Sequence, residues 1–336
     1  MKMIRILHLM IICGLLIGFS GCVNTATPED QLLQTAIAKK GKPQKSYQDI
    51  IVGFAQLGAE SDWRVANSIS IKESASQLGV ELRFYDAQQK QENQIRAVRE
   101  MIVQKVDVIG ISPIVETGWE EVFNEAKEAG IPIILVDRSA KVPEDYYISY
   151  LGSDFVEEGR NAARMMAKVT NGKANIVELE GTFDSAPAND RYRGFREVIK
   201  NYPQMDIIDS QVGDFTRAKG KEVMSYFLQK EGASITAVFA HNDDMALGAI
   251  QSIEEAGLKP GVDIKIVSVD AERSAFQAMI AGKINATIEC NPLLGPQFFD
   301  LALRVANGEN VPKRVPSKES VFLPDNASQI LPTRKY

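Results

Sequence analysis

Histidine and cysteine are scarce in this chain, which has two histidines and three cysteines among 336 residues. Beyond residue 22, His241 is the one histidine and Cys290 the one cysteine. A single cysteine cannot form an intrachain disulfide. A single histidine argues against a Ser-His-Asp triad, a Cys-His nucleophile and a histidine-rich metal site. We therefore expect neither a catalytic residue nor a metal.

Several motifs of cofactor enzymes are also absent. No G-x-G-x-x-G follows the first predicted strand and no G-x-x-x-x-G-K-[ST] occurs, which removes the main support for a dinucleotide or P-loop site. Without a G-x-S-x-G elbow, an α/β-hydrolase is disfavoured. The net charge is −6 without a basic cluster, which argues against nucleic acid as a partner. We expect no cofactor.

Length and composition are those of a folded protein with more than one core. At 336 residues the chain exceeds the usual size of one domain, which makes two domains the first expectation. Hydrophobic residues make up 45% and charged residues 24%, proportions typical of globular rather than disordered chains.

The N-terminus carries the pattern of an export signal. Two basic residues precede an apolar run, Ile6 to Phe19, that is too short to span a bilayer but suits the core of a signal peptide. Two small residues and Cys22 follow, which resembles the bacterial lipobox, although that motif favours an aliphatic residue where this chain has Phe19. We predict a signal peptide over 1–22, lipidation of Cys22, and a polar tether over 23–47. The protein would then lie in the periplasm or on the outer face of the cytoplasmic membrane. An uncleaved transmembrane anchor is the alternative.

Polar side chains follow three predicted strands, at the point where each strand ends. They are Asp137 and Arg138 after Ile133–Val136, Asn242 and Asp243 after Ala237–Ala240, and Asp270 after Ile264–Val269. Mainly apolar runs are typical of parallel strands that are buried on both faces, and ligands bind outside the carboxyl ends of such strands. Carboxylate, carboxamide and guanidinium groups suit a polyhydroxylated ligand, because each hydroxyl both donates and accepts a hydrogen bond. Asn242 or Asp243 can equally be a plain cap of the following helix.

Strand and helix patterns alternate along the folded part, which predicts parallel sheets with right-handed crossovers. The first set runs from a strand at Ile50–Phe54 to the strand that ends at Asp137. The second set runs from Asn175–Leu179, with a helix expected at Asp190–Lys200, to Ala286–Cys290. The sequence Gly152–Asp154 interrupts the periodicity between the two sets, and we place the break there.

Several of these segments resemble the periplasmic sugar-binding proteins of ABC importers, of the ribose-binding type. The resemblance covers Ile50 to Pro324 and rests on Asp137-Arg138, on His-Asn-Asp-Asp-Met-Ala-Leu-Gly-Ala at 241–249, and on Val269-Asp270. Further motifs are similar to the galactofuranose type of this family. They are Gly58-x-Glu60-Ser61-x-Trp63-Arg64, the run Gln88–Ile95, Thr117-Gly118-Trp119 and Gly213–Arg217.

The resemblance implies a type I periplasmic-binding fold, an α/β fold with two Rossmann-like lobes of parallel sheet joined by a three-crossover hinge. The crossovers are expected near Gly152–Asp154, Cys290–Pro292 and Pro316–Ser320. The N-terminal lobe is expected over 48–153 plus about 291–317, and the C-terminal lobe over 154–290 plus about 318–336.

The resemblance also implies a set of sugar-binding residues. They are Glu60, Trp63, Arg64, Asp137, Arg138, Asn189, Arg191, Asn242 and Asp270. Ribose-binding proteins carry an arginine where this chain has Asn189, whereas the galactofuranose type carries it two positions later, here Arg191, which disfavours ribose. Each role has an alternative: Asp137-Arg138 as a structural ion pair, Trp63 as a core residue, and Arg64 as part of a solvated face.

The implied function is the capture of a monosaccharide, galactofuranose-like or a related sugar, by hinge closure and its delivery to an ABC permease. The protein would act as a monomer and not as an enzyme. The same module could instead report sugar to a membrane sensor kinase or chemoreceptor. A repressor of the same superfamily needs DNA-binding helices where the signal peptide stands. A glycosidase needs a paired acid and nucleophile. Glu60, Asp137 and Asp270 supply carboxylates, but a sugar-binding cleft needs these as well.

Overall fold

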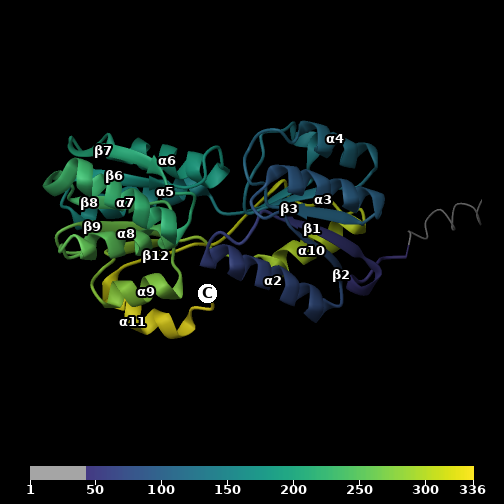
Figure 1. Cartoon of the computed structure of the whole chain (residues 1–336). Helices are drawn as coiled ribbons and strands as arrows, with labels where there is room; N and C mark the ends of the chain where they lie inside the picture. Colours follow the sequence, from purple (N-terminus) through teal and green to yellow (C-terminus); the bar gives the residue numbers. More distant parts are fainter. Residues whose placement is uncertain (1–42) are drawn as a thin grey trace, which may run out of the picture. The chain divides into compact units, whose positions relative to one another are not determined.

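The computed structural model describes residues 43–336 (Figure 1). The predicted signal peptide, the lipidation site Cys22 and most of the predicted tether lie outside this part of the chain. Within residues 43–336, no helix combines the length and the apolar character that crossing a membrane requires.

Two six-stranded sheets form the framework of residues 43–336. The first sheet has the order β11 (Arg314–Pro316), β5 (Ser149–Gly152), β4 (Ile133–Val136), β3 (Val108–Ile111), β1 (Ile51–Gln56), β2 (Glu81–Asp86), and all its strand pairs are parallel. Its helices are α2 (Asp62–Leu78), α3 (Gln91–Val103), α4 (Glu120–Glu128) and α10 (Gly295–Ala306), with short 3-10 helices at Tyr47–Asp49 and Glu144–Tyr146. We call this sheet and its helices the first lobe.

The second sheet repeats this arrangement. Its order is β12 (Val321–Phe322), β10 (Ala286–Glu289), β9 (Lys265–Asp270), β8 (Ala237–Ala240), β6 (Lys173–Glu180), β7 (Gln204–Val212), with β12 antiparallel and the others parallel. Its helices are α5 (Phe155–Val169), α6 (Ala186–Ile199), α7 (Arg217–Glu231), α8 (Asp243–Glu255), α9 (Arg273–Ile280) and α11 (Pro324–Ile330), with 3-10 helices at Gly232–Ser234 and Leu331–Thr333. We call this the second lobe.

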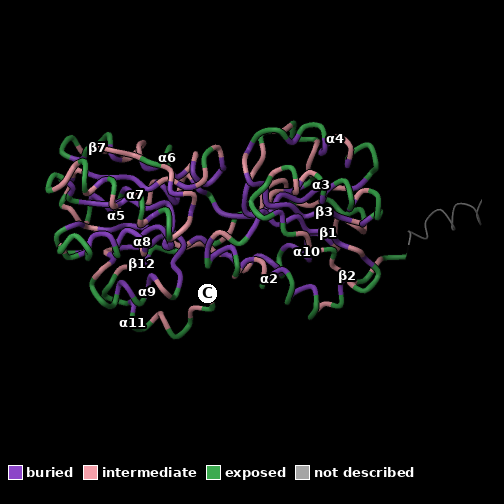
Figure 2. Tube along the Cα trace, viewed as in Figure 1, coloured by how far each residue is buried: buried purple, intermediate pink, exposed green. Residues whose placement is uncertain are grey.

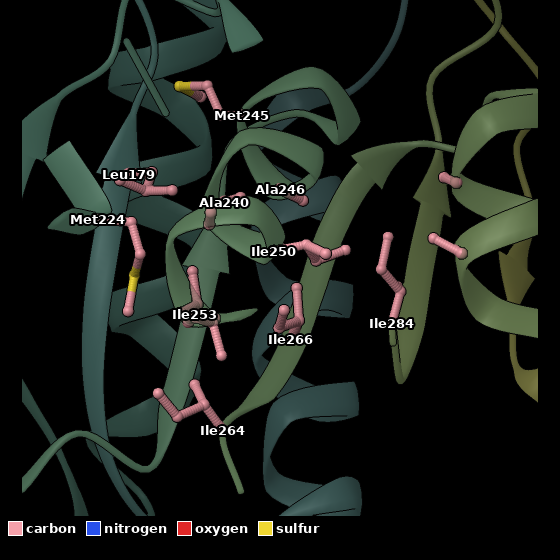
Figure 3. Close-up of a cluster of buried hydrophobic side chains, with 14 of the residues drawn as sticks. Leu179, Met224, Ala240, Met245, Ala246, Ile250, Ile253, Ile264, Ile266 and Ile284 are labelled. Atoms are coloured by element: carbon pink, nitrogen blue, oxygen red, sulfur yellow. The ribbon is translucent and has the colours of Figure 1, made fainter. Parts of the chain in front are cut away.

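The central strands of each sheet are buried on both faces. Successive side chains of a strand point to opposite sides and therefore enter different clusters. On β4, Ile133 and Leu135 join the core cluster that includes α3 and α4, whereas Ile134 and Val136 join the one that includes α2 and α10. The same alternation divides β8 between two clusters of the second lobe. Figure 2 shows the central strands largely buried and exposed segments toward the outside of each lobe, and Figure 3 shows the cluster between the second sheet and α8.

The chain passes three times between the sheets, after β5, after β10 and after β11. The C-terminal part of the chain, coloured yellow in Figure 1, therefore contributes to both lobes, since α10 belongs to the first lobe and α11 to the second. The predicted fold of two α/β lobes with parallel sheets and three crossovers is confirmed.

Two helices differ from the sequence prediction. Helix α5 is absent from the predicted pattern, although Phe155, Ala162, Ala163 and Met166 are among the residues of its buried face. Asp154, placed in the predicted break, caps this helix by accepting from the Glu157 amide. Helix α6 begins at Ala186 rather than Asp190, since Pro187 suits the first turn of a helix.

Candidate functional site

A small cavity is lined by residues of both lobes. Eight of the nine predicted sugar-binding residues line it, namely Glu60, Trp63, Arg64, Asp137, Arg138, Arg191, Asn242 and Asp270. Ser61, Pro187, Phe215 and Cys290 complete the lining. The sheets therefore bring together residues that lie far apart in the sequence.

The site lies at the carboxyl ends of the strands, as the sequence predicted. Glu60 and Arg64 come from the connection of β1 to α2 and its first turn, and Asp137 follows β4. In the second lobe, Asn242 follows β8 and Asp270 ends β9. The strand order reverses beside β1 in one sheet and beside β6 in the other, and such switch points open a crevice for ligands.

Two arginines and two carboxylates form a buried cluster in the first lobe. Arg64 donates from Nη2 to Asp137 Oδ2 at 2.6 Å and from Nε to Glu60 Oε1 at 3.1 Å. Arg138 Nη2 donates to the same Glu60 oxygen at 3.5 Å. All four side chains are at most 5% exposed, so Arg64 is not part of a solvated face. Equal numbers of opposite charges compensate the cost of burying them.

The two arginines of this cluster respond differently to their surroundings. Burial lowers the pKa of both guanidinium groups, but Asp137 and Glu60 raise the pKa of Arg64 above its ordinary value. Arg138 has a pKa of about 10, because burial and the neighbouring charge of Arg64 outweigh its attraction to Glu60 and Asp137. Both side chains therefore remain charged at neutral pH.

Two polar atoms of the cluster have no hydrogen-bond partner among the described residues. They are Glu60 Oε2, an acceptor, and Arg138 Nε, a donor, and both are buried. Buried polar groups are nearly always paired, so unpaired ones at a cavity point to a ligand. A hydroxyl group can donate to the first atom and accept from the second.

A second buried cluster surrounds Arg191. Its Nε donates to Glu158 Oε2 at 2.7 Å and its Nη1 to the His241 carbonyl at 2.6 Å, while its Nη2 lies 3.7 Å from Asp270 Oδ1. Burial raises the pKa of Asp270 well above its usual range, and Arg191 opposes this only in part. Asp270 therefore places a buried carboxyl group beside Arg191 in the cavity lining.

Aromatic rings cover parts of the cavity wall. The Phe215 ring centroid lies 5.3 Å from the guanidinium carbon of Arg138 and 5.9 Å from that of Arg191. Trp63 donates from its indole to the Cys290 carbonyl at 2.6 Å, which ties α2 to the second crossover. Trp63 is 4% exposed and packs in a core cluster of the second lobe, so it is a core residue as well as a lining residue.

The backbone at the cavity is strained in the left-handed region. Asp137 has φ 64°, Asp270 has φ 122° and Phe215 has φ 60°, conformations that non-glycine residues rarely adopt. Hydrogen bonds hold Asp137 in place, since its amide donates to the Leu151 carbonyl at 2.8 Å and its carbonyl accepts from Tyr150 Oη at 2.7 Å. Such strain concentrates at functional sites, where it directs side chains.

Asn242 is both a cap and a lining residue. Its Oδ1 accepts from the Met245 amide at 3.0 Å and its Nδ2 donates to the Phe215 carbonyl at 3.0 Å. The predicted cap of α8 is therefore confirmed, and one amide hydrogen is left for a ligand. Asp243 points instead into the lobe, where its Oδ2 accepts from the Glu272 amide at 2.8 Å.

Asn189 does not line the cavity, contrary to the expectation from the sequence. Because α6 starts early, Asn189 lies in its first turn and donates to Glu116 Oε2 of the first lobe at 2.7 Å. Of the lining residues that the prediction missed, Phe215 lies within the quoted Gly213–Arg217 motif. Cys290 sits at an expected crossover.

Comparisons with known proteins agree with this geometry. The galactofuranose-binding protein YtfQ of Escherichia coli (strain K12) is 46% identical over 85% of this chain and 92% of its own. A solved structure from Shewanella sp. ANA-3, the periplasmic component of an arabinose ABC transporter bound to α- and β-L-arabinofuranose, is 48% identical, with a TM-score of 0.83 over 85% of this chain and 95% of that one. A Mycobacterium smegmatis protein in complex with β-D-fucofuranose is 52% identical, with the same TM-score and coverage. The model of the periplasmic binding protein domain matches residues 52–310, and the chain belongs to this family.

Proposed function

We propose that this protein binds a monosaccharide in its five-membered ring form and passes it to an ABC permease. The proposal rests on two buried atoms, Glu60 Oε2 and Arg138 Nε, that have no hydrogen-bond partner among the described residues and belong to residues lining the cavity between the lobes. One atom accepts and the other donates, which is what sugar hydroxyls require. The three relatives support the ring form, since each is named for or bound to a furanose.

Binding takes place by closure of the lobes. We propose that residues 48–153 with 291–317 move as one body and residues 154–290 with 318–336 as the other. A sugar that bonds to Asp137 in the first lobe and Asp270 in the second binds the closed state better than the open state. It therefore shifts the population toward closure.

Selectivity follows from burial of the polar groups. Arg64, Asp137, Arg138 and Asp270 are all at most 4% exposed, so an analogue without a matching hydroxyl leaves one of them unpaired. An unpaired buried group costs about 1–3 kcal/mol, and more when it is charged. A deoxy analogue should thus bind roughly 10–100-fold more weakly.

The ligand is bound without being converted. Glu60 and Asp137 both accept hydrogen bonds from Arg64, an arrangement that suits hydroxyl recognition. The relatives are named for binding and not for a reaction. This is tested by incubating the sugar with the protein, which should leave the sugar chemically unchanged.

We place the protein outside the cytoplasmic membrane, as a monomer held by a lipid on Cys22. A tethered receptor stays close to its permease, which raises the effective concentration for delivery. The Shewanella relative is a component of an ABC transporter, which supports import over signalling to a sensor kinase or chemoreceptor.

Thermal denaturation with a panel of sugars tests the proposal. The chain from residue 23 onward is melted with galactose, arabinose, fucose, ribose and methyl furanosides and pyranosides of the same sugars. A ligand raises the midpoint by an amount that grows with its concentration over its dissociation constant. Furanosides should raise it and pyranosides should not, with the effect lost in Asp137→Ala. Absence of a shift with every sugar would refute the proposal.

A further inference from the structure

Three carboxylates gather at the edge of the cleft, outside the residues that line the cavity. Asp62 begins α2 of the first lobe, Asp244 lies in the first turn of α8, and Glu272 directly precedes α9, both in the second lobe. Each residue brings a carboxylate oxygen within 4.8 Å of the other two. The cluster therefore joins the two lobes at a second point.

The charge of the cluster is only partly balanced. Arg217 donates to Asp244 Oδ1 at 2.7 Å from Nη2 and at 2.9 Å from Nε, and to Asp62 Oδ2 at 3.2 Å. In residues 43–336, no other basic side chain lies within ion-pair distance of these three carboxylates. One guanidinium against three carboxylates leaves two negative charges.

The buried carboxylate of Glu272 has no partner for one of its two oxygens. It is 2% exposed, and its Oε1 has no hydrogen-bond partner among the described residues. Its Oε2 accepts from Ser274 Oγ at 3.2 Å. A buried acceptor of this kind requires a proton or a cation.

We propose that Asp62, Asp244 and Glu272 bind a divalent cation of the Ca²⁺ class. Oxygen ligands select hard cations, and Ca²⁺ tolerates irregular, flexible sets of carboxylates. Two positive charges match the two that are uncompensated. The Asp62 side chain is 68% exposed, which gives an ion access from solvent. Extracellular Ca²⁺ modules bind with dissociation constants of about 10⁻⁴–10⁻³ M, the range we expect here.

A cation at this position would stabilise the closed state of the two lobes, an effect that we call the clamp. The Asp62 amide already donates to Asp244 Oδ2 at 2.7 Å across the lobes. A cation held by carboxylates of both lobes binds only when they are together, so it favours closure. It must then raise the affinity for any ligand that binds the closed state, by reciprocal linkage. This consequence rests on the proposed sugar-binding function, whereas cation binding itself does not.

Terbium luminescence tests cation binding directly. Tb³⁺ replaces Ca²⁺ at oxygen sites and emits when a nearby indole is excited, and Trp63 adjoins Asp62 in the chain. The chain from residue 23 onward should give a saturable signal that Ca²⁺ displaces. Glu272→Gln and the exposed Asp62→Asn should each weaken binding about tenfold or more, following the loss of a charged ligand. Glu255→Gln, an exposed carboxylate at the far end of α8, is the matched control and should bind normally.

Two results would overturn the proposal. One is the absence of a Ca²⁺-displaceable signal in the wild-type chain up to about 10 mM Ca²⁺, well above the expected range. The other is an unchanged signal in Glu272→Gln, which would mean that Glu272 is not a ligand of the cation.

Sugar titrations in Ca²⁺ and in EDTA then test the clamp. We expect several-fold tighter sugar binding with Ca²⁺ in the wild type and no difference in Glu272→Gln. Terbium binding with equal sugar affinities would refute the clamp alone. Terbium binding with no sugar bound would refute the proposed sugar function and leave the cation site standing.

Discussion

Replacing Glu60 by Gln probes the buried acceptor with almost no change in volume. Glu60 Oε1 already accepts from Arg64 and Arg138. The new amide oxygen should take this place, which leaves an NH₂ group where the unpaired Oε2 stood. The cavity then loses an anionic acceptor and gains a neutral donor.

The magnitude follows from the hydrogen bond that is lost. Bonds to a charged group contribute roughly 1.5–3 kcal/mol, so sugar affinity should fall by about 10–100-fold. Folding should suffer less, because Arg64 keeps its 2.6 Å bond to Asp137. The loss should therefore appear in ligand binding rather than in the melting temperature of the free protein.

Isothermal titration calorimetry with the preferred furanose, paired with melting of the free protein, measures both effects. Glu92→Gln, an exposed residue of α3, is the matched control and should bind within about twofold of wild type. If Glu60→Gln melts normally and also binds within twofold of wild type, the unpaired oxygen does not contact the sugar and the reasoning is wrong.

Three further predictions concern stability and closure. Burial alone would raise the pKa of Glu178, but His241 and Arg196 outweigh it and lower this pKa to about 2. Glu178→Gln should therefore lower the free energy of unfolding by up to about 3 kcal/mol above pH 4.5. A stability difference between variant and wild type that persists in urea melts at pH 2 would contradict this. Burial raises the pKa of Glu319 to about 9, so the stability of the wild type should decline as pH rises from 4.5 toward 9. Glu319→Gln should therefore stabilise the protein most at high pH. An equal gain in stability at pH 5 and pH 8.5 would refute this. Thr117→Val removes the 2.8 Å bond to Asp184 of the other lobe, and calorimetry should show sugar binding about two- to fivefold weaker, whereas unchanged affinity would mean that this contact does not favour closure.

The strand ends of the site were predictable because burial and polarity change abruptly there. Asp137, Asn242 and Asp270 follow short, mainly apolar runs that were predicted as buried strands, and all three line the cavity. The local pattern predicts the site because the carboxyl ends of neighbouring parallel strands lie at the same edge of the sheet.

The remaining features depend on contacts that no local pattern encodes. Phe215 reaches the cavity through a loop with left-handed backbone, where neither helical nor strand periodicity applies. The bond between Asp62 and Asp244 joins residues 182 positions apart. Asn189 was assigned by resemblance, and in the structure it lies in the first turn of α6 and donates to Glu116 instead of lining the cavity.

A crystal structure of the protein with its preferred furanose tests the central claim most directly. We predict sugar hydroxyl oxygens within about 2.7–3.2 Å of Glu60 Oε2 and Arg138 Nε, with Asp270 or Asn242 bonded to the same molecule from the second lobe. A sugar that leaves both first-lobe atoms unpaired, or that contacts one lobe alone, would contradict the account.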